Sequence, residues 1–178
     1  MSIRTILVSA VLLITLVGSS AVAGDPNQVF KGKIMLSTKR FPLTAKSKDA
    51  YISAVRKQSM SNFQENKANG TWKIYFAAFL SRPLNDVEYV IKFYEIGAGG
   101  QQLLGASEAF NDERGQKTIV SNIKLEKKAF GVNKHLLMTI ENKGVVYAST
   151  RFKILGEGER FSGKVNFSEE EAAGKSNE

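Results

Sequence analysis

Alternation of apolar and polar residues from position 71 onward constrains the fold of this chain more than any other feature. Apolar side chains recur at every second residue over 72–80, 87–93 and 136–140, and over 119–125 with Ser121 as the exception. A period of two is typical of β-strands, in which successive side chains point to opposite faces. Turn residues separate the runs at intervals that suit hairpins better than crossover helices. The chain is therefore predicted to be mainly β, with antiparallel strands.

One predicted strand and one predicted turn give further information about the fold. Over 71–80 both faces are apolar, with Trp72 and Phe76 on one face and Tyr75 and Phe79 on the other. A strand that is apolar on both faces is expected in the centre of a fold. The glycine-rich segment 97–100 predicts a hairpin turn between strands 87–94 and 101–110.

The last hairpin is predicted to turn at Asn142-Lys143, with Gly144 in the left-handed conformation of a bulge. In its returning strand, Val146 is expected to face inward with Ala148, Thr150, Phe152 and Ile154, and Tyr147 to face outward. Segment 136–148 resembles the closing hairpin of immunoglobulin-like sandwiches in bacterial exported proteins. The resemblance implies a fold and no active residues, and the cysteines of the Cys…Trp…Cys pattern of true immunoglobulin domains are missing.

With residues 29–36 these segments make seven predicted strands, which we expect to form an antiparallel two-sheet sandwich of immunoglobulin-like architecture. Residues 41–69 break the alternation. A helical spacing over 49–57, with Asp49 as a cap, predicts one short helix that crosses between the sheets. Residues 24–156 are therefore predicted to be one β-sandwich domain. Alternation fades after Gly156, and 157–178 are predicted to be a polar, partly disordered C-terminal tail.

The first 23 residues have the pattern of a secretory signal peptide. Arg4 precedes the apolar run 6–17, and small residues follow up to Gly24. The apolar run is shorter than the roughly 20 residues that a transmembrane helix needs. We expect an exported protein, periplasmic or extracellular, and not a transmembrane one. A chain without cysteine favours a bacterial origin over a disulfide-rich eukaryotic secreted one.

The composition excludes several kinds of chemistry. Without cysteine there is no thiol catalysis or thiolate metal site. A Ser-His-Asp triad would have to use His135, the only histidine, but the sequence has no G-x-S-x-G motif to supply the serine. His135 is therefore expected to be a solvent-facing strand residue. We predict a protein that is not an enzyme and has no cofactor or metal site. The alternative is a carbohydrate-active enzyme that uses two carboxylates, from the set Glu88, Glu95, Glu108, Asp112, Glu113, Glu126 and Glu141.

Positive charge is concentrated in one segment. The chain has a formal net charge of +8, and residues 31–73 contain ten Lys or Arg against two acids. The candidate binding residues are Lys39, Arg40, Lys46, Lys48, Arg56 and Lys57. An exported basic region fits an anionic envelope surface or another envelope protein, and nucleic acid is an improbable partner. The oligomeric state stays open.

Three other interpretations fit the same region. The bases are surface solubilisers only, the domain binds a lipid surface, or the acidic tail folds back over the bases of its own chain. We predict that the protein is a non-catalytic binding or structural module that contacts the envelope.

Overall fold

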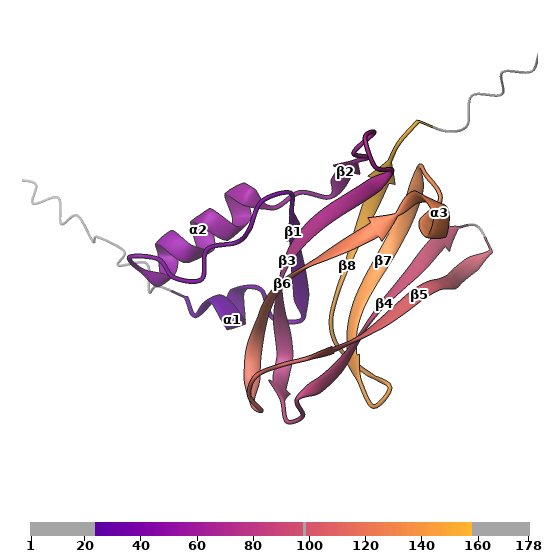
Figure 1. Ribbon diagram of the computed structural model, residues 1–178. Coiled ribbons are helices and arrows are strands. Elements are labelled where there is room, and N and C mark those ends of the chain that lie inside the picture. The colour runs from indigo at the N-terminus through magenta and orange to yellow at the C-terminus, as the bar shows by residue number, and fades with distance from the viewer. Residues whose placement is uncertain (1–23, 98, 158–178) are drawn as a thin grey trace, which may run out of the picture.

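The computed structural model describes residues 24–97 and 99–157, which form a curled β-sheet with two helices beside it and a third at one end (Figure 1). The predicted signal peptide and the tail beyond Glu157 lie outside the described residues. The elements in chain order are α1 (Pro26–Val29), β1 (Lys33–Ser37), α2 (Lys48–Gln58), β2 (Asn62–Gln64), β3 (Thr71–Leu84), β4 (Glu88–Gly97), β5 (Gly100–Phe110), β6 (Gln116–Glu126), α3 (Lys127–Phe130), β7 (Lys134–Asn142) and β8 (Val145–Leu155).

All eight strands belong to one sheet, in the order β5-β4-β7-β8-β1-β3-β6, with β2 also paired to β8. Neighbouring strands are antiparallel except for β1–β8 and β2–β8, which are parallel. The sheet curls into a mixed half-barrel whose edges, β5 and β6, follow one another in the chain. A mainly β fold is confirmed. One mixed sheet replaces the predicted pair of antiparallel sheets, and three short helices replace the single one.

The main hydrophobic core lies inside the curl. The inner face of β3 contributes Trp72 and Phe76, and these pack with the inner faces of β4, β7 and β8. Two edge-on aromatic pairs join residues far apart in the chain, with ring centroids 5.8 Å apart for Phe63–Phe152 and 6.4 Å apart for Phe93–Phe152. Phe130 of α3 meets Phe93 edge-on at 5.5 Å. One concave face therefore buries what two facing sheets would bury in a sandwich.

A second, smaller core lies on the outer face of β3, under α1 and α2. Ala77 and Phe79 of β3 are buried there with Phe30, Phe41, Ile52 and Val55. The prediction that β3 is apolar on both faces because it is central is confirmed. The helix expected between two sheets instead covers the convex side of one.

The β7–β8 turn lies one residue later than predicted. Asn142 pairs with Val145, and the two residues between them, Lys143 and Gly144, both have positive φ, of 50° and 78°. Positive φ at both central residues is the mark of a type I′ hairpin turn. The bulge falls on β8, where Tyr147 is the extra residue between two paired neighbours. Val146 is therefore 48% exposed and Tyr147 only 8%, the reverse of the prediction for these two side chains.

Candidate functional site

The charged residues proposed as a binding site are carried by α2 and the loop that precedes it. Ser47 caps the helix, with its Oγ accepting a hydrogen bond from the Ala50 N–H at 3.1 Å. This role was predicted for Asp49, which lies instead in the first turn. Arg56 and Lys57 lie in the last turn. Acid in the first turn and bases in the last turn both match the helix dipole.

The inner side of α2 is fixed to the sheet by the smaller core. Ile52 and Val55 are buried, and Phe79 of β3 meets Tyr51 edge-on with ring centroids 6.4 Å apart. Phe79 also packs on Phe30 at 4.8 Å. We call α1, α2 and the loop 38–47 the helical layer. Apolar contacts hold this layer on the sheet, and its six candidate basic side chains are exposed.

The two backbone segments that carry four of the six candidate residues meet at the C-terminal end of α2. The Gln58 side-chain amide donates to the carbonyl oxygens of Lys39, at 2.7 Å, and Arg40, at 2.8 Å. These two bonds fix the loop against the helix end that carries Arg56 and Lys57. Lys39 and Lys57 line one shallow groove of about 440 Å³. We call these four residues the basic cluster.

The other two candidates, Lys46 and Lys48, lie at the opposite end of the same helix. Eight residues separate Lys48 from Arg56, which is about 12 Å along a helix axis. All six candidates are exposed. The six residues thus form a group of four and a separate pair on one layer. This division was not predicted from the sequence.

A groove beside the basic residues adds an apolar component to this surface. It runs between the loop before α2 and the outer face of β6, has a volume of about 480 Å³, and is lined by Leu43, Lys48, Tyr51, Phe79 and Val120 among others. A smaller hollow of about 300 Å³ continues it toward Arg40. Leu43 belongs to both hollows and is 72% exposed. A ligand held here would meet cations at both ends and apolar side chains between them.

The electrostatics of the helical layer are one-sided. Asp49 is the only acid from residue 31 to residue 57, against eight Lys and Arg. Within the part of the chain that the structure describes, none of the six candidates forms an ion pair. One cation is involved in a packing contact, since the Arg56 guanidinium lies 5.8 Å from the Phe30 ring centroid. The remaining charge is available to an anionic partner.

Among the carboxylates of the enzyme alternative, Glu141 is the buried one. It is 6% exposed on the outer face of β7 and accepts hydrogen bonds from Lys92 Nζ at 2.7 Å, Thr139 Oγ1 at 2.7 Å and the Tyr94 hydroxyl at 3.3 Å. Burial opposes its ionisation, but these bonds outweigh burial, and the pKa of Glu141 lies below its usual value. An ionised, fully bonded carboxylate of this kind stabilises the sheet.

Glu141→Gln is expected to lower the free energy of unfolding by about 1–3 kcal/mol near pH 7, because a charged acceptor is lost from a buried hydrogen-bond set. A folded pKa below the unfolded value stabilises the protein above the unfolded pKa of about 4.3 and loses that effect as pH falls through the folded pKa. Urea unfolding from pH 7 to pH 3 should therefore show the variant and the natural chain converging in acid. Glu126→Gln, at an exposed carboxylate 3.5 Å from Lys124, should change stability by less than about 1 kcal/mol. A gap for Glu141→Gln that persists unchanged at pH 3 would contradict this assignment.

The structure also bears on the histidine, on metal-ligating groups and on membrane-spanning helices. His135 is solvent-exposed on β7, as predicted. Residues 24–97 and 99–157 contain no group of three or more metal-ligating side chains. No helix in these same residues is long and apolar enough to cross a membrane. No protein-family model matches the chain, and no curated protein matches it either.

Proposed function

We propose that the protein is an exported, non-catalytic binding module whose helical layer contacts an anionic surface of the cell envelope. The observation that carries the proposal is the basic cluster: two Gln58 hydrogen bonds hold the backbone of Lys39 and Arg40 at the helix end that carries Arg56 and Lys57, and all four side chains are exposed. Lys46 and Lys48 extend the positive surface past the groove that contains Leu43.

The chemistry of this surface suits phosphate or carboxylate groups displayed on a surface. Each Lys or Arg close to an anionic membrane contributes about 1 kcal/mol, and this contribution is screened by salt. The exposed Leu43 beside these bases would enter the apolar boundary beneath the head groups. An envelope protein with an acidic face would use the same cations and would not need Leu43. The immunoglobulin-like resemblance adds nothing to this argument.

Co-sedimentation with anionic liposomes tests the proposal. Residues 24–178 should sediment with vesicles that contain an anionic phospholipid at low salt and stay in the supernatant with zwitterionic vesicles. Changing all six candidates to Glu should weaken binding at least about tenfold, because six favourable contacts become repulsive. Raising the salt concentration should weaken binding of the natural chain in the same direction.

A matched control separates the helical layer from net charge. Arg114, Lys124, Lys128, Lys143, Arg151 and Lys153 are also two Arg and four Lys, all exposed and none in the helical layer. Changing them to Glu alters net charge equally and should weaken binding much less. Equal losses in the two variants would reduce the effect to net charge and refute the proposed surface. Salt-resistant binding to envelope fractions but not to liposomes would favour a protein partner.

A further inference from the structure

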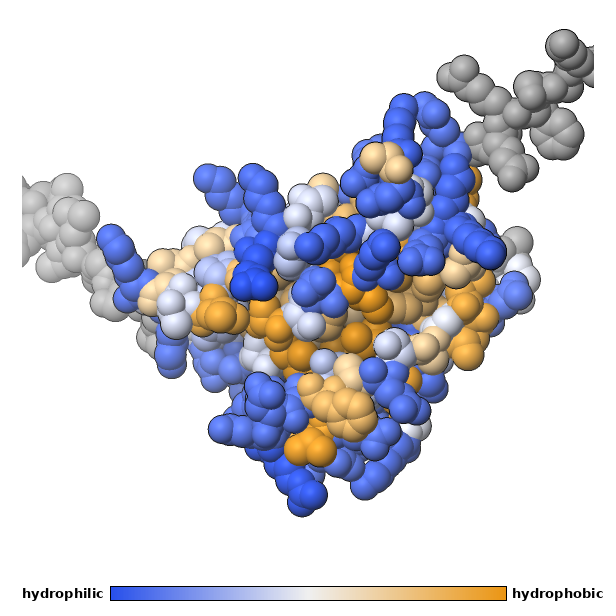
Figure 2. Space-filling model, viewed as in Figure 1, coloured by the Kyte–Doolittle hydropathy of each residue, from blue (hydrophilic) through white to orange (hydrophobic). Residues whose placement is uncertain are grey.

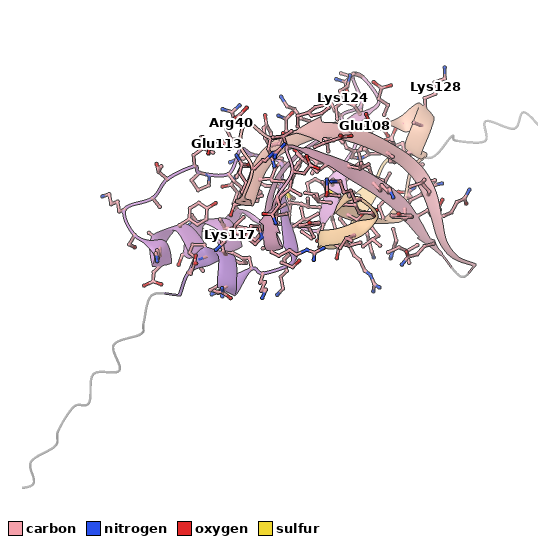
Figure 3. The ribbon with its side chains drawn as sticks, turned by 90° about the horizontal axis from the view of Figure 1, so that it is seen from below. Arg40, Glu108, Glu113, Lys117, Lys124 and Lys128 are labelled. Atoms are coloured by element: carbon pink, nitrogen blue, oxygen red, sulfur yellow. The ribbon has the colours of Figure 1, made fainter. Side chains whose placement is uncertain are left out.

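The two edges of the half-barrel leave an apolar strip between them. β6 ends the strand order on one side and pairs only with β3 among the described residues, and β5 pairs only with β4. Half-buried side chains from both borders, Leu104 and Ala109 of β5 and Ile123 of β6, pack against the main core there. Figure 2 shows the resulting apolar surface between the two strands. In Figure 3 Lys124 of β6 and Glu108 of β5 lie on the same side of the molecule, where these edges are.

An uncovered strand edge is a liability for a native protein, because it can pair with another chain, and native proteins often shorten, charge or cover it. Half of the peptide groups of β6 point away from β3 and can pair with another strand. The inner face of β6 has a mixed profile, in which Ile119 and Leu125 are buried while Ser121 is exposed. A strand that paired with this edge would therefore need apolar residues at alternate positions, with more bulk opposite Ser121 than opposite Ile123.

Residues 160–168 of this chain have that pattern. They read Arg-Phe-Ser-Gly-Lys-Val-Asn-Phe-Ser, so that Phe161, Gly163, Val165 and Phe167 alternate with polar residues. They lie outside the described residues, and from the sequence alone their alternation is too short and too interrupted by Gly163 to predict a strand. The open edge of β6 gives the segment a partner.

The end of the described chain is placed to start such a pairing. β8 and β6 run in the same direction across the sheet, as the parallel β1–β8 pair and the antiparallel β1–β3 and β3–β6 pairs require. The chain therefore leaves β8 at the end of the sheet where β6 also ends. Lys127, the residue after β6, donates from its Nζ to the Glu157 carbonyl oxygen at 2.9 Å. Three residues, which span up to about 10 Å, then lead to Arg160.

We propose that residues 160–168 of the same chain form a ninth strand, antiparallel to β6, that covers the apolar strip. Placing Phe161 opposite Leu125 sets Gly163 opposite Ile123, Val165 opposite Ser121 and Phe167 opposite Ile119. The small glycine then meets a large side chain, and valine meets the small serine.

The same register also pairs charges at both ends of the strand. Arg160 comes opposite Glu126, and Glu169 comes opposite Lys117. The three acids 169–171 would then lie beside the start of β6, where Arg114 and Lys117 are, and not over the basic cluster. This arrangement differs from the alternative in which the acidic tail covers the bases of α2, and it does not depend on the proposed function.

Disulfide trapping tests the register, because the chain has no cysteine of its own. The pair Asn122→Cys with Lys164→Cys joins residues directly opposite each other on the outer face, about 5 Å apart. It should oxidise to an intramolecular disulfide at least about tenfold faster than two controls. Asn122→Cys with Ser168→Cys lies four residues out of register, and Lys143→Cys with Lys164→Cys tests reach to the β7–β8 turn.

A second set of variants tests the apolar contacts in the full chain. In the Asn122→Cys, Lys164→Cys background, changing Phe161, Val165 and Phe167 to Ser should slow trapping about tenfold or more, because the inward side chains are lost. Changing the outward residues Ser162, Asn166 and Ser168 to Ala should leave the rate within about twofold. Equal trapping rates for all three cysteine pairs would mean that the tail does not pair with β6, and the proposal would be wrong. Disulfide-linked dimers at micromolar concentration would also overturn it, since they assign the strand to a second copy.

Discussion

Phe79→Ala is expected to lower the free energy of unfolding by about 3–5 kcal/mol and to loosen the helical layer. Phe79 is 1% exposed and lies between β3 and both helices, with its ring 4.8 Å from Phe30 and 6.4 Å from Tyr51. Its removal leaves a cavity between β3 and the helical layer. Urea unfolding followed by far-UV circular dichroism and by the fluorescence of the only tryptophan measures the loss.

The same substitution at an exposed phenylalanine provides the control. Phe110, at the end of β5, is 69% exposed, so Phe110→Ala should change stability by no more than about 0.5 kcal/mol. Phe79→Ala should also weaken liposome binding in buffer without urea, because the position of the basic cluster depends on the packing of α2 against β3. A Phe79→Ala variant with natural stability would mean that the helices do not pack on β3 as described.

Prediction from the sequence succeeded where one strand determined its own environment. β3 has apolar residues on both faces, and any fold that buries Trp72 on one side and Phe79 on the other must place this strand centrally. The residues of the helix were also predicted correctly, because the spacing of Tyr51 and Val55 is local, but its position relative to the sheet was not. Such patterns depend only on neighbours within a few residues.

The arrangement of the strands was not predictable in the same way. An inward-facing strand residue has the same pattern whether it meets a second sheet or the far side of one curled sheet. The decisive pairing is parallel, between β1 and β8, which are more than 100 residues apart in the chain. β2 was missed because it has three residues, of which only Phe63 is buried.

The basic residues of the candidate site could be predicted from the sequence, but their arrangement in space could not. An excess of bases in residues 31–73 identified the six residues, but the position of Lys39 and Arg40 beside the end of α2 depends on hydrogen bonds from Gln58 across 18 and 19 positions in the chain. Neither the groove at Leu43 nor the free edge of β6 has a local sequence signal, since both are formed by segments that meet only in the folded protein. The alternation in 160–168 became informative only against that edge.

Trp72→Ala is expected to cost about 3–5 kcal/mol, and Trp72→Phe only about 1–2 kcal/mol. The indole is 1% exposed on the inner face of β3, where it packs in the main core. Its Nε1–H donates to the Leu155 carbonyl oxygen at 3.1 Å and so ties β3 to the end of β8. That oxygen also accepts from the Glu65 N–H at 2.8 Å, so it keeps one partner when the indole is lost.

The two substitutions therefore separate ring burial from the hydrogen bond. Phenylalanine keeps most of the buried ring and loses the donor, whereas alanine loses both and leaves a cavity. Because each variant removes the only tryptophan, far-UV circular dichroism in urea is the appropriate probe for both. If Trp72→Phe were as damaging as Trp72→Ala, the link to Leu155 would dominate over packing, and the main core would depend on the junction of β3 and β8 more than on the volume that its inner face buries.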